Sequence, residues 1–308
     1  MTIPRAAVDV GTNSVRLLVV DASGARVTRE LAITRLGAAV DATGHLDDAA
    51  LDRTLQTITR YRAIWTANGV TEGVRIAATS AVRDASDRDR FFDGVMEATG
   101  VQAEVLTGEE EAALAFAGAA GAVEVGRPTA VVDIGGGSTE LIVGDERGSV
   151  AASVSLQLGC VRVRERHLAT DPPTDAEVER ARGLIGEQLD LADAALAERG
   201  AELRSVAGMV AVAGTATTLA ALHLGLPAYE ERAIHGTRLP SSSLAQLVAE
   251  LNGMTSAARA ALGPMQPGRE DVIHAGALVL HGIVERYGLP EVVVSEADNL
   301  DGLVASLG

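Results

Sequence analysis

The sequence predicts an α/β protein built from two similar domains. Strand-like apolar runs alternate with helical segments along the chain, which is the pattern of the α/β class. One motif of strand, short turn and second strand occurs twice, as VDVGTNSVRLLV at Val8 to Val19 and as VDIGGGSTELIV at Val132 to Val143. With 308 residues, the chain is long enough for two domains of ordinary size.

The repeat holds at a constant offset of 124 residues, so each copy is expected to be a hairpin with a functional tip. Two such hairpins indicate two domains that face a shared cleft. The segment Gly121 to Pro128 is the best linker candidate, which gives a first domain at 1–124 and a second at 125–308. A final helix near 297–308 is expected to pack back on the first domain. The matched positions are Asp9 with Asp133, Gly11 with Gly135, and Ser14 with Ser138.

Helical spacing of apolar residues and short apolar runs between turns predict the remaining elements. The first half has strands at Leu31 to Val40, Val74 to Ala78 and Val101 to Leu106, with a loop at Thr79 to Asp84 after the second of them. Its helices are at Asp47 to Asn68, Arg88 to Thr99 and Glu109 to Ala120. The second half has strands at Val150 to Leu158, Val206 to Ala213 and Glu291 to Ser295, with a turn at Gly214 to Thr218. Thr174 and Glu177 form a capping box that starts a helix ending at Glu198. Two more helices follow, one capped by Ser243 and one at Asp271 to Tyr287.

The formal net charge of −16 argues against binding to nucleic-acid polymers or anionic membranes. A polyanionic substrate would need a local positive site. All 26 basic residues are arginine, which suits phosphate contacts but is explained more readily by a composition bias of the whole chain. The single cysteine, Cys160, excludes a disulfide framework and favours a reducing, cytoplasmic setting. The uncharged stretch Ser205 to Tyr229 is interrupted by Gly214 and Pro227, so we interpret it as strand, turn and helix rather than as a membrane span.

The second copy of the motif has the composition of a phosphate and magnesium loop. Glycines allow a tight turn whose amides wrap a phosphate, and flanking carboxylates can hold a hard cation. The candidates are Asp133 and Glu140 for a metal ion, and Gly135, Gly136, Gly137, Ser138 and Thr139 for phosphate. The alternative is a structural turn in which Asp133 caps its own loop.

The first copy offers a similar set of groups from the other half. Its phosphate candidates are Gly11, Thr12, Asn13, Ser14 and Arg16, with Asp9 as a further metal candidate. Serine and asparagine are common in any turn, and the repeat is what favours a site.

Three other features remain open on composition alone. The glutamates at Glu109 to Glu111 fit a solvated helix start as well as a catalytic acid, because acids are favourable at a helix N-terminus. Arg83 is equally ambiguous. Gly214 and Thr215 could bind phosphate or could form a packing turn. The six histidines show no metal-ligand spacing, and Cys160 is expected in the core.

The chain resembles the exopolyphosphatase and guanosine pentaphosphate phosphatase family, in its short two-domain form. The matching segments run from end to end in the family's order. They are VDVGTNSVRLLV, ATSAVRDA at Ala78 to Ala85, TGEEEA at Thr107 to Ala112, DIGGGSTEL at Asp133 to Leu141, AGTATTLAA at Ala213 to Ala221 and REDVIHAGA at Arg269 to Ala277.

The resemblance implies two ribonuclease-H-like domains of the actin, sugar-kinase and heat-shock-ATPase type around a central cleft. It implies magnesium-dependent hydrolysis of the terminal phosphate of inorganic polyphosphate. Glu111 then corresponds to the catalytic base, Asp133 and Glu140 to the metal-site acids, and Arg83 to the phosphate-contacting arginine. We also expect a homodimer.

Two departures and three alternatives accompany this resemblance. Ala113 stands where relatives often have arginine, which would weaken the grip on long chains, and the last motif reads SEADNLDG. The substrate could be guanosine pentaphosphate, whose 5′ end is also a triphosphate. The chain could be a kinase of the same superfamily, or a sensor that binds nucleotide or polyphosphate with little turnover.

Overall fold

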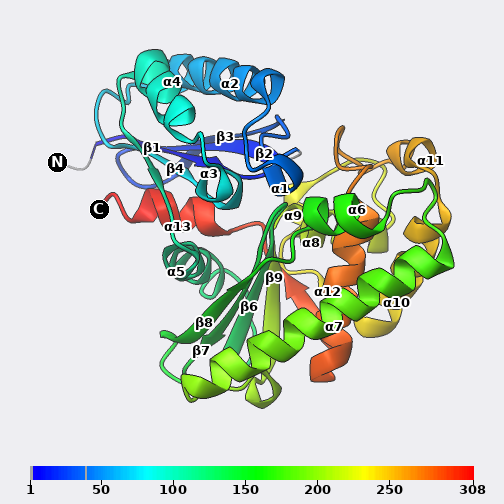
Figure 1. Cartoon of the computed structure of the whole chain (residues 1–308). Helices are drawn as coiled ribbons and strands as arrows, with labels where there is room; N and C mark the ends of the chain where they lie inside the picture. The colour runs from blue at the N-terminus through cyan, green and yellow to red at the C-terminus, as the bar shows by residue number, and fades with distance from the viewer. Residues whose placement is uncertain (1–2, 39) are drawn as a thin grey trace. The chain divides into compact units, whose positions relative to one another are not determined.

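The computed structural model describes residues 3–38 and 40–308 (Figure 1). It divides into two compact units, Met1–Gly118 with Asn299–Gly308, and Ala119–Asp298. The sequence-based division after residue 124 stays a prediction. No helix in the described part of the chain is long and apolar enough to cross a membrane.

The first unit contains a five-stranded mixed sheet in the order β3-β2-β1-β4-β5. β1 and β2 form an antiparallel hairpin, β2 also pairs antiparallel with β3, and β4 is parallel to both β1 and β5. The strands are β1 (Arg5–Val10), β2 (Ser14–Val20), β3 (Arg26–Ile33), β4 (Val74–Ala78) and β5 (Ala103–Val105).

Helices cover both faces of this sheet (Figure 1). Alternate residues of β1 and β2 pack against α2 and α4 on one face, whereas Ala7 and Leu18 pack against the final helix, α13, on the other. The helices are α1 (Val40–Thr43), α2 (Asp48–Ala67), α3 (Ser80–Asp84), α4 (Asp89–Thr99), α5 (Gly108–Ala119) and α13 (Asn299–Ala305).

The second unit repeats this sheet with one added edge strand, in the order β10-β11-β9-β6-β7-β8. β6, β7 and β8 are antiparallel, and β9 is parallel to β6 and to β11. The strands are β6 (Thr129–Ile134), β7 (Thr139–Gly144), β8 (Val150–Leu156), β9 (Gly208–Val212), β10 (Arg238–Pro240) and β11 (Glu291–Val294). Strand for strand, β6 to β8, β9 and β11 match β1 to β3, β4 and β5.

One large hydrophobic cluster joins this second sheet to its helices. The predicted capping box starts the longest of them, because the Thr174 side chain accepts from the Glu177 amide and the Glu177 carboxylate accepts from the Thr174 amide. The helices are α6 (Cys160–His167), α7 (Asp175–Glu198), a 3₁₀ turn η1 (Leu203–Ser205), α8 (Ala213–His223), α9 (Glu231–Ile234), α10 (Ser241–Gly253), α11 (Ser256–Ala260) and α12 (Ile273–Tyr287).

The structure corrects the predicted strand at Leu31 to Val40, which ends at Ile33. The amides of Thr34 and Arg35 donate to the carbonyl of Asn13, so the chain leaves the strand ladder to bind the tip of the first hairpin. Residue 39 of the predicted strand lies outside the described residues.

One predicted loop and one predicted turn are helical. Thr79 to Asp84 contains α3, and Gly214 to Thr218 lies in the first turns of α8. Ser243 does not cap its helix, because α10 already begins at Ser241 after Pro240. Sequence reasoning also missed α6, whose alternating valines and arginines have no helical spacing. Its start is set by contacts with the second hairpin rather than by its own pattern.

Candidate functional site

The two hairpins have the same turn. The amide of Gly11 donates to the carbonyl of Ser14 at 2.9 Å, and the amide of Gly135 donates to the carbonyl of Ser138 at 3.0 Å. Cross-strand register places Asp9 opposite Arg16 in the first hairpin and Asp133 opposite Glu140 in the second. The sequence repeat is therefore a repeat of backbone structure.

Carbonyl groups at both tips are hydrogen-bonded to the protein. The carbonyl of Thr12 accepts from the amide of Gly37 at 2.8 Å, and the carbonyl of Gly136 accepts from the amide of Val161 at 2.9 Å. Among the described residues, no carbonyl accepts from the tip amides of Thr12, Asn13, Gly136 or Gly137 outside the strand ladders. With carbonyls occupied and amides available, each tip suits an anion.

A glycine from the next segment packs on each tip. A Cβ on Gly37 would lie 2.2 Å from the Cγ2 atom of Thr12, and a Cβ on Gly159 would lie 2.1 Å from the carbonyl oxygen of Gly136. The guanidinium of Arg162 adds a bond to the second tip, where its Nε donates to the carbonyl of Gly137 at 2.9 Å.

The first hairpin carries an ion pair of its own. Arg16 donates to Oδ2 of Asp9 from Nε at 3.0 Å and from Nη2 at 2.6 Å, and Asp9 is buried. Both residues interact with Asn299 at the start of α13. A metal ion would have to compete with Arg16 for the Asp9 carboxylate, and Asp9 as a metal ligand stays a prediction.

The second hairpin instead places two acids side by side. Asp133 and Glu140 are directly opposed across the strands and are both buried, and the hydroxyl of Ser155 donates to Oε1 of Glu140 at 2.7 Å. Like charges at opposed positions are destabilising, and a cation would offset their repulsion. Magnesium is commonly held by one or two carboxylates together with substrate phosphates, so this pair fits it. Sequence reasoning did not single out Ser155.

The structure distinguishes the three glutamates at the start of α5. Glu110 forms a capping box with Thr107, whose amide donates to the Glu110 carboxylate at 2.9 Å while the Glu110 amide donates to the Thr107 hydroxyl. The hydrogen bond from the Thr107 amide lowers the pKa of Glu110. Glu109 is exposed, whereas Glu111 is only 6% exposed.

Glu111 and Arg83 lie together within the first unit. Nη1 of Arg83, at the end of α3, donates to Oε2 of Glu111 at 3.3 Å and to the carbonyl of Leu106 at 2.8 Å. Two residues that were ambiguous in the sequence thus form one ion pair, in which a partly exposed guanidinium orients the buried carboxylate of Glu111.

The Gly214 segment holds an arginine that the sequence analysis did not single out. Nη1 of Arg269 donates to the hydroxyl of Thr218 at 3.0 Å and to the carbonyl of Gly214 at 3.3 Å, and its guanidinium lies 5.8 Å from the ring centre of Tyr229. A Cβ on Gly214 would lie 2.7 Å from the Arg269 Cζ atom, so the glycine leaves room for the arginine. The only signal in the sequence was its place at the start of REDVIHAGA.

Two threonines among the phosphate candidates are packed into the second unit. The hydroxyl of Thr139 donates to the carbonyl of Leu158, and Thr139 is fully buried. Thr215 lies against Gly276 of α12, where an added Cβ would come within 2.5 Å of its hydroxyl oxygen. Cys160 is in the core as expected, and burial raises the pKa of its thiol to about 11.

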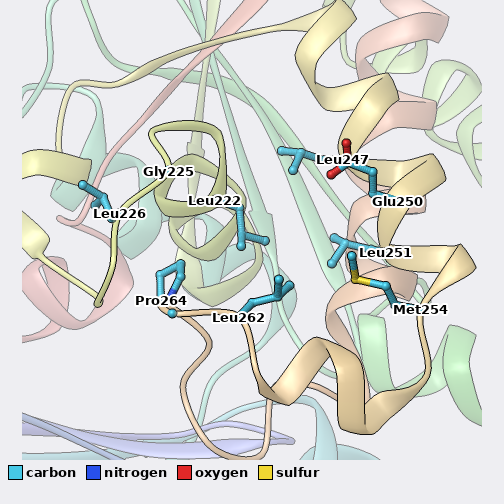
Figure 2. A pocket seen from close by; sticks show the side chains of 10 residues that line it. Leu222, Gly225, Leu226, Leu247, Glu250, Leu251, Met254, Leu262 and Pro264 are labelled. Atoms are coloured by element: carbon cyan, nitrogen blue, oxygen red, sulfur yellow. The ribbon is translucent and has the colours of Figure 1, made fainter.

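An apolar cavity of about 260 Å³ also lies in the second unit (Figure 2). Leucines of α8 and α10 line it, with Met254 and Pro264, and Glu250 is its charged residue. None of the described site candidates lines this cavity.

The described residues hold no group of three or more His, Cys, Asp or Glu side chains arranged as a metal site. A metal ion at Asp133 and Glu140 would therefore need further ligands from water or substrate.

Comparisons with known proteins give the relatives of this chain. Exopolyphosphatase 2 of Mycobacterium tuberculosis is 45% identical over 319 aligned positions, which cover 98% of each chain. A crystal structure of an exopolyphosphatase-like protein has a TM-score of 0.94 and 34% identity, with 99% of each chain covered. The PPX-GPPA enzyme of Aquifex aeolicus has a TM-score of 0.81 and 28% identity over 99% of each chain. These likenesses confirm the expected pair of ribonuclease-H-like folds.

The sequence model described as the Ppx/GppA phosphatase family matches residues 18–306, which is nearly the whole chain. The chain therefore belongs to the Ppx/GppA phosphatase family.

Proposed function

We propose that the protein is an exopolyphosphatase that removes the terminal phosphate of inorganic polyphosphate. The observation that carries the proposal is the 45% identity, over 98% of both chains, to a protein named exopolyphosphatase 2. Two anion-suited tips, an acid pair and the Arg83–Glu111 pair supply the groups that such a hydrolysis requires.

The hairpin tips and the arginines are proposed to bind the phosphate chain. The tip amides would donate to phosphate oxygens, together with the side chains of Thr12, Asn13, Ser14 and Ser138. Arg16 and Arg83 would add charge-assisted hydrogen bonds, which are stronger than neutral ones. Gly214 is proposed to keep Arg269 in place, and the buried Thr139 and Thr215 to hold backbone rather than to contact substrate.

Asp133 and Glu140 are proposed to hold magnesium, with Ser155 orienting Glu140. When bound, the ion would neutralise charge on the phosphates of the substrate. Asp9 takes a different role in this proposal, since it orients Arg16 through their ion pair.

Glu111 is proposed to accept a proton from the attacking water. The water oxygen forms a bond to the terminal phosphorus, the bridging P–O bond breaks, and the shortened polyphosphate leaves with the bonding electron pair. Positioning and electrostatic stabilisation carry most of the rate in such transfers. Arg83 would keep the Glu111 carboxylate oriented toward the water.

The test is orthophosphate release from polyphosphate with magnesium. Glu111→Gln should lower kcat by about 10²- to 10⁴-fold, the usual contribution of a general base, while polyphosphate binding stays measurable. The matched control is Glu109→Gln, which changes an exposed glutamate of the same helix and should keep full activity. Full activity of Glu111→Gln would refute the assignment.

The same assay separates the alternatives if it compares short polyphosphate, long polyphosphate, guanosine pentaphosphate and ATP. Preference for guanosine pentaphosphate would favour the alternative substrate that the resemblance implies. Binding without release from any of the four would indicate a sensor. A cytoplasmic homodimer is part of the proposal, and light scattering of the purified protein tests the oligomeric state.

A further inference from the structure

Asn299 joins the C-terminal helix to the ion pair of the first hairpin. It is the first residue of α13 and is only 5% exposed. Its Nδ2 donates to Oδ1 of Asp9 at 3.4 Å, and its Oδ1 accepts from Nη2 of Arg16. Arg16 in turn donates to the other Asp9 oxygen, Oδ2. The three side chains therefore close a ring of hydrogen bonds.

This ring needs a carboxamide at position 299. The group must offer a donor to the carboxylate of Asp9 and an acceptor to the guanidinium of Arg16, and an amide side chain has both. A carboxylate would keep the acceptor but would place a second negative charge beside Asp9. An alanine would remove both bonds within a buried site, where lost partners are costly.

The helix that carries Asn299 is fixed by contacts independent of the ring. Asp301 accepts from Nη1 of Arg29, in β3, at 2.8 Å. Leu300, Leu303 and Val304 pack against Ala7 and Leu18 of the sheet. Because these contacts hold α13 in place, the Asn299 side chain is presented to Arg16 at a defined position.

We propose that Asn299 is a positioning residue for Arg16 and thereby sets the affinity of the first hairpin for a phosphate chain. The inference rests on the proposed function, in which Arg16 contacts substrate phosphate. A guanidinium held on two sides has little conformational freedom left to lose when an anion binds, so its hydrogen bonds form at small entropic cost. Without Asn299, Arg16 keeps its charge and its two hydrogen bonds to Asp9 but loses the contact that holds its Nη2 from the other side.

The test compares KM and kcat for polyphosphate hydrolysis in Asn299→Ala, Asn299→Asp and the wild type. Asn299→Ala should raise KM about tenfold with kcat changed less than about twofold, because the loss falls on substrate binding. Asn299→Asp should raise KM at least as much. Asp301→Ala is the matched control, since it removes the other polar link of the same helix without touching the ring. It should lower the melting temperature and leave KM near the wild-type value.

A double-mutant cycle with Arg16→Ala distinguishes positioning from a general loss of structure. If Asn299 acts through Arg16, Asn299→Ala should change KM by less than about twofold in the Arg16→Ala background. Equal effects of Asn299→Ala in both backgrounds, or an equal rise of KM in Asp301→Ala, would overturn the inference.

A binding measurement tests the proposed function separately from the inference about Asn299. Calorimetric titration of short polyphosphate gives Kd for each variant whether or not it turns over. A wild type that binds but does not hydrolyse refutes the exopolyphosphatase proposal, and the inference is then judged on the same cycle in Kd. A wild type that neither binds nor hydrolyses polyphosphate refutes both.

Discussion

The two hairpins share a backbone and differ in charge. In each, a glycine amide closes the turn on the carbonyl of a serine three residues later. At the cross-strand position below the tip, the first hairpin pairs Asp9 with Arg16, whereas the second pairs Asp133 with Glu140. One side-chain difference at the same place replaces a pair of opposite charges with a pair of acids.

The difference in charge indicates that the two copies of the motif have different roles. The neutral first hairpin has its arginine fixed and can present it to an anion without a metal ion. Under the proposed function, the second hairpin carries two acids at the matched position and would need a cation to bind phosphate. A repeat in sequence therefore predicts equivalent geometry, but the chemistry of each copy follows from the residues at matched positions.

The largest expected effect comes from giving the second hairpin the charges of the first. In Glu140→Arg, the introduced arginine should pair with Asp133 and remove the proposed magnesium site. We expect phosphate release to fall by about 10³-fold or more, as when a principal electrostatic group is lost, and the dependence of the rate on magnesium to disappear. Magnesium titrations of the rate and calorimetry of magnesium binding measure this. Arg16→Glu is the reciprocal variant. Magnesium-dependent activity retained in Glu140→Arg would contradict the proposed difference between the two hairpins.

A smaller effect should distinguish how each tip is packed. Gly159→Ala drives a methyl group into the backbone carbonyl of Gly136, whereas Gly37→Ala meets mainly the Cγ2 methyl of Thr12. Overpacking costs about 1–3 kcal/mol of unfolding free energy, and we expect Gly159→Ala to exceed Gly37→Ala. Adding Thr12→Ser, which deletes that methyl, should recover much of the loss in Gly37→Ala. Denaturant unfolding measures all three variants, and absence of recovery would contradict the packing argument.

The third prediction concerns stability at acidic pH, where the second unit should unfold at a higher pH than the first. Burial, with help from the charges of Arg259 and Arg164, lowers the pKa of His274 to about 3. The unfolded chain binds this proton near pH 6.5, so stability is complete above that pH and falls as the pH drops toward 3. The hydroxyl of Thr170 is the main cause that lowers the pKa of Glu177 to about 2, so its contribution is lost between about pH 4.5 and 2.

Hydrogen exchange resolved by peptide should therefore show the second unit losing protection before the first as the pH falls from 7 to 4. His274→Leu removes the titrating group from a buried position. It should therefore reduce the difference between the pH values at which the two units lose protection. Earlier loss in the first unit, or an unchanged pH dependence in His274→Leu, would show that other groups control acid unfolding.

Local pattern was enough to predict the hairpins and most helices. The capping box of α7, the glycine end of α4 at Gly100 and the strand Val74–Ala78 all follow from residues within a few positions of one another. Two of the failures, at β3 and α6, have a common cause. β3 ends early because Thr34 and Arg35 bind Asn13, and α6 begins where Cys160 and Val161 bind the second tip. Spacing within a segment carries no information about such partners.

The sequence by itself determined the repeated turn, the acid at each strand end and the family, because turn chemistry and motif order are written in neighbouring residues. Only the tertiary structure decided which of three consecutive glutamates is buried beside Arg83. It alone showed that Arg16 neutralises Asp9 with help from Asn299, 283 residues further along the chain, and that Arg269 reaches Gly214. Charge and burial at a site depend on which distant side chains the packing brings together, and that is a property of the whole fold.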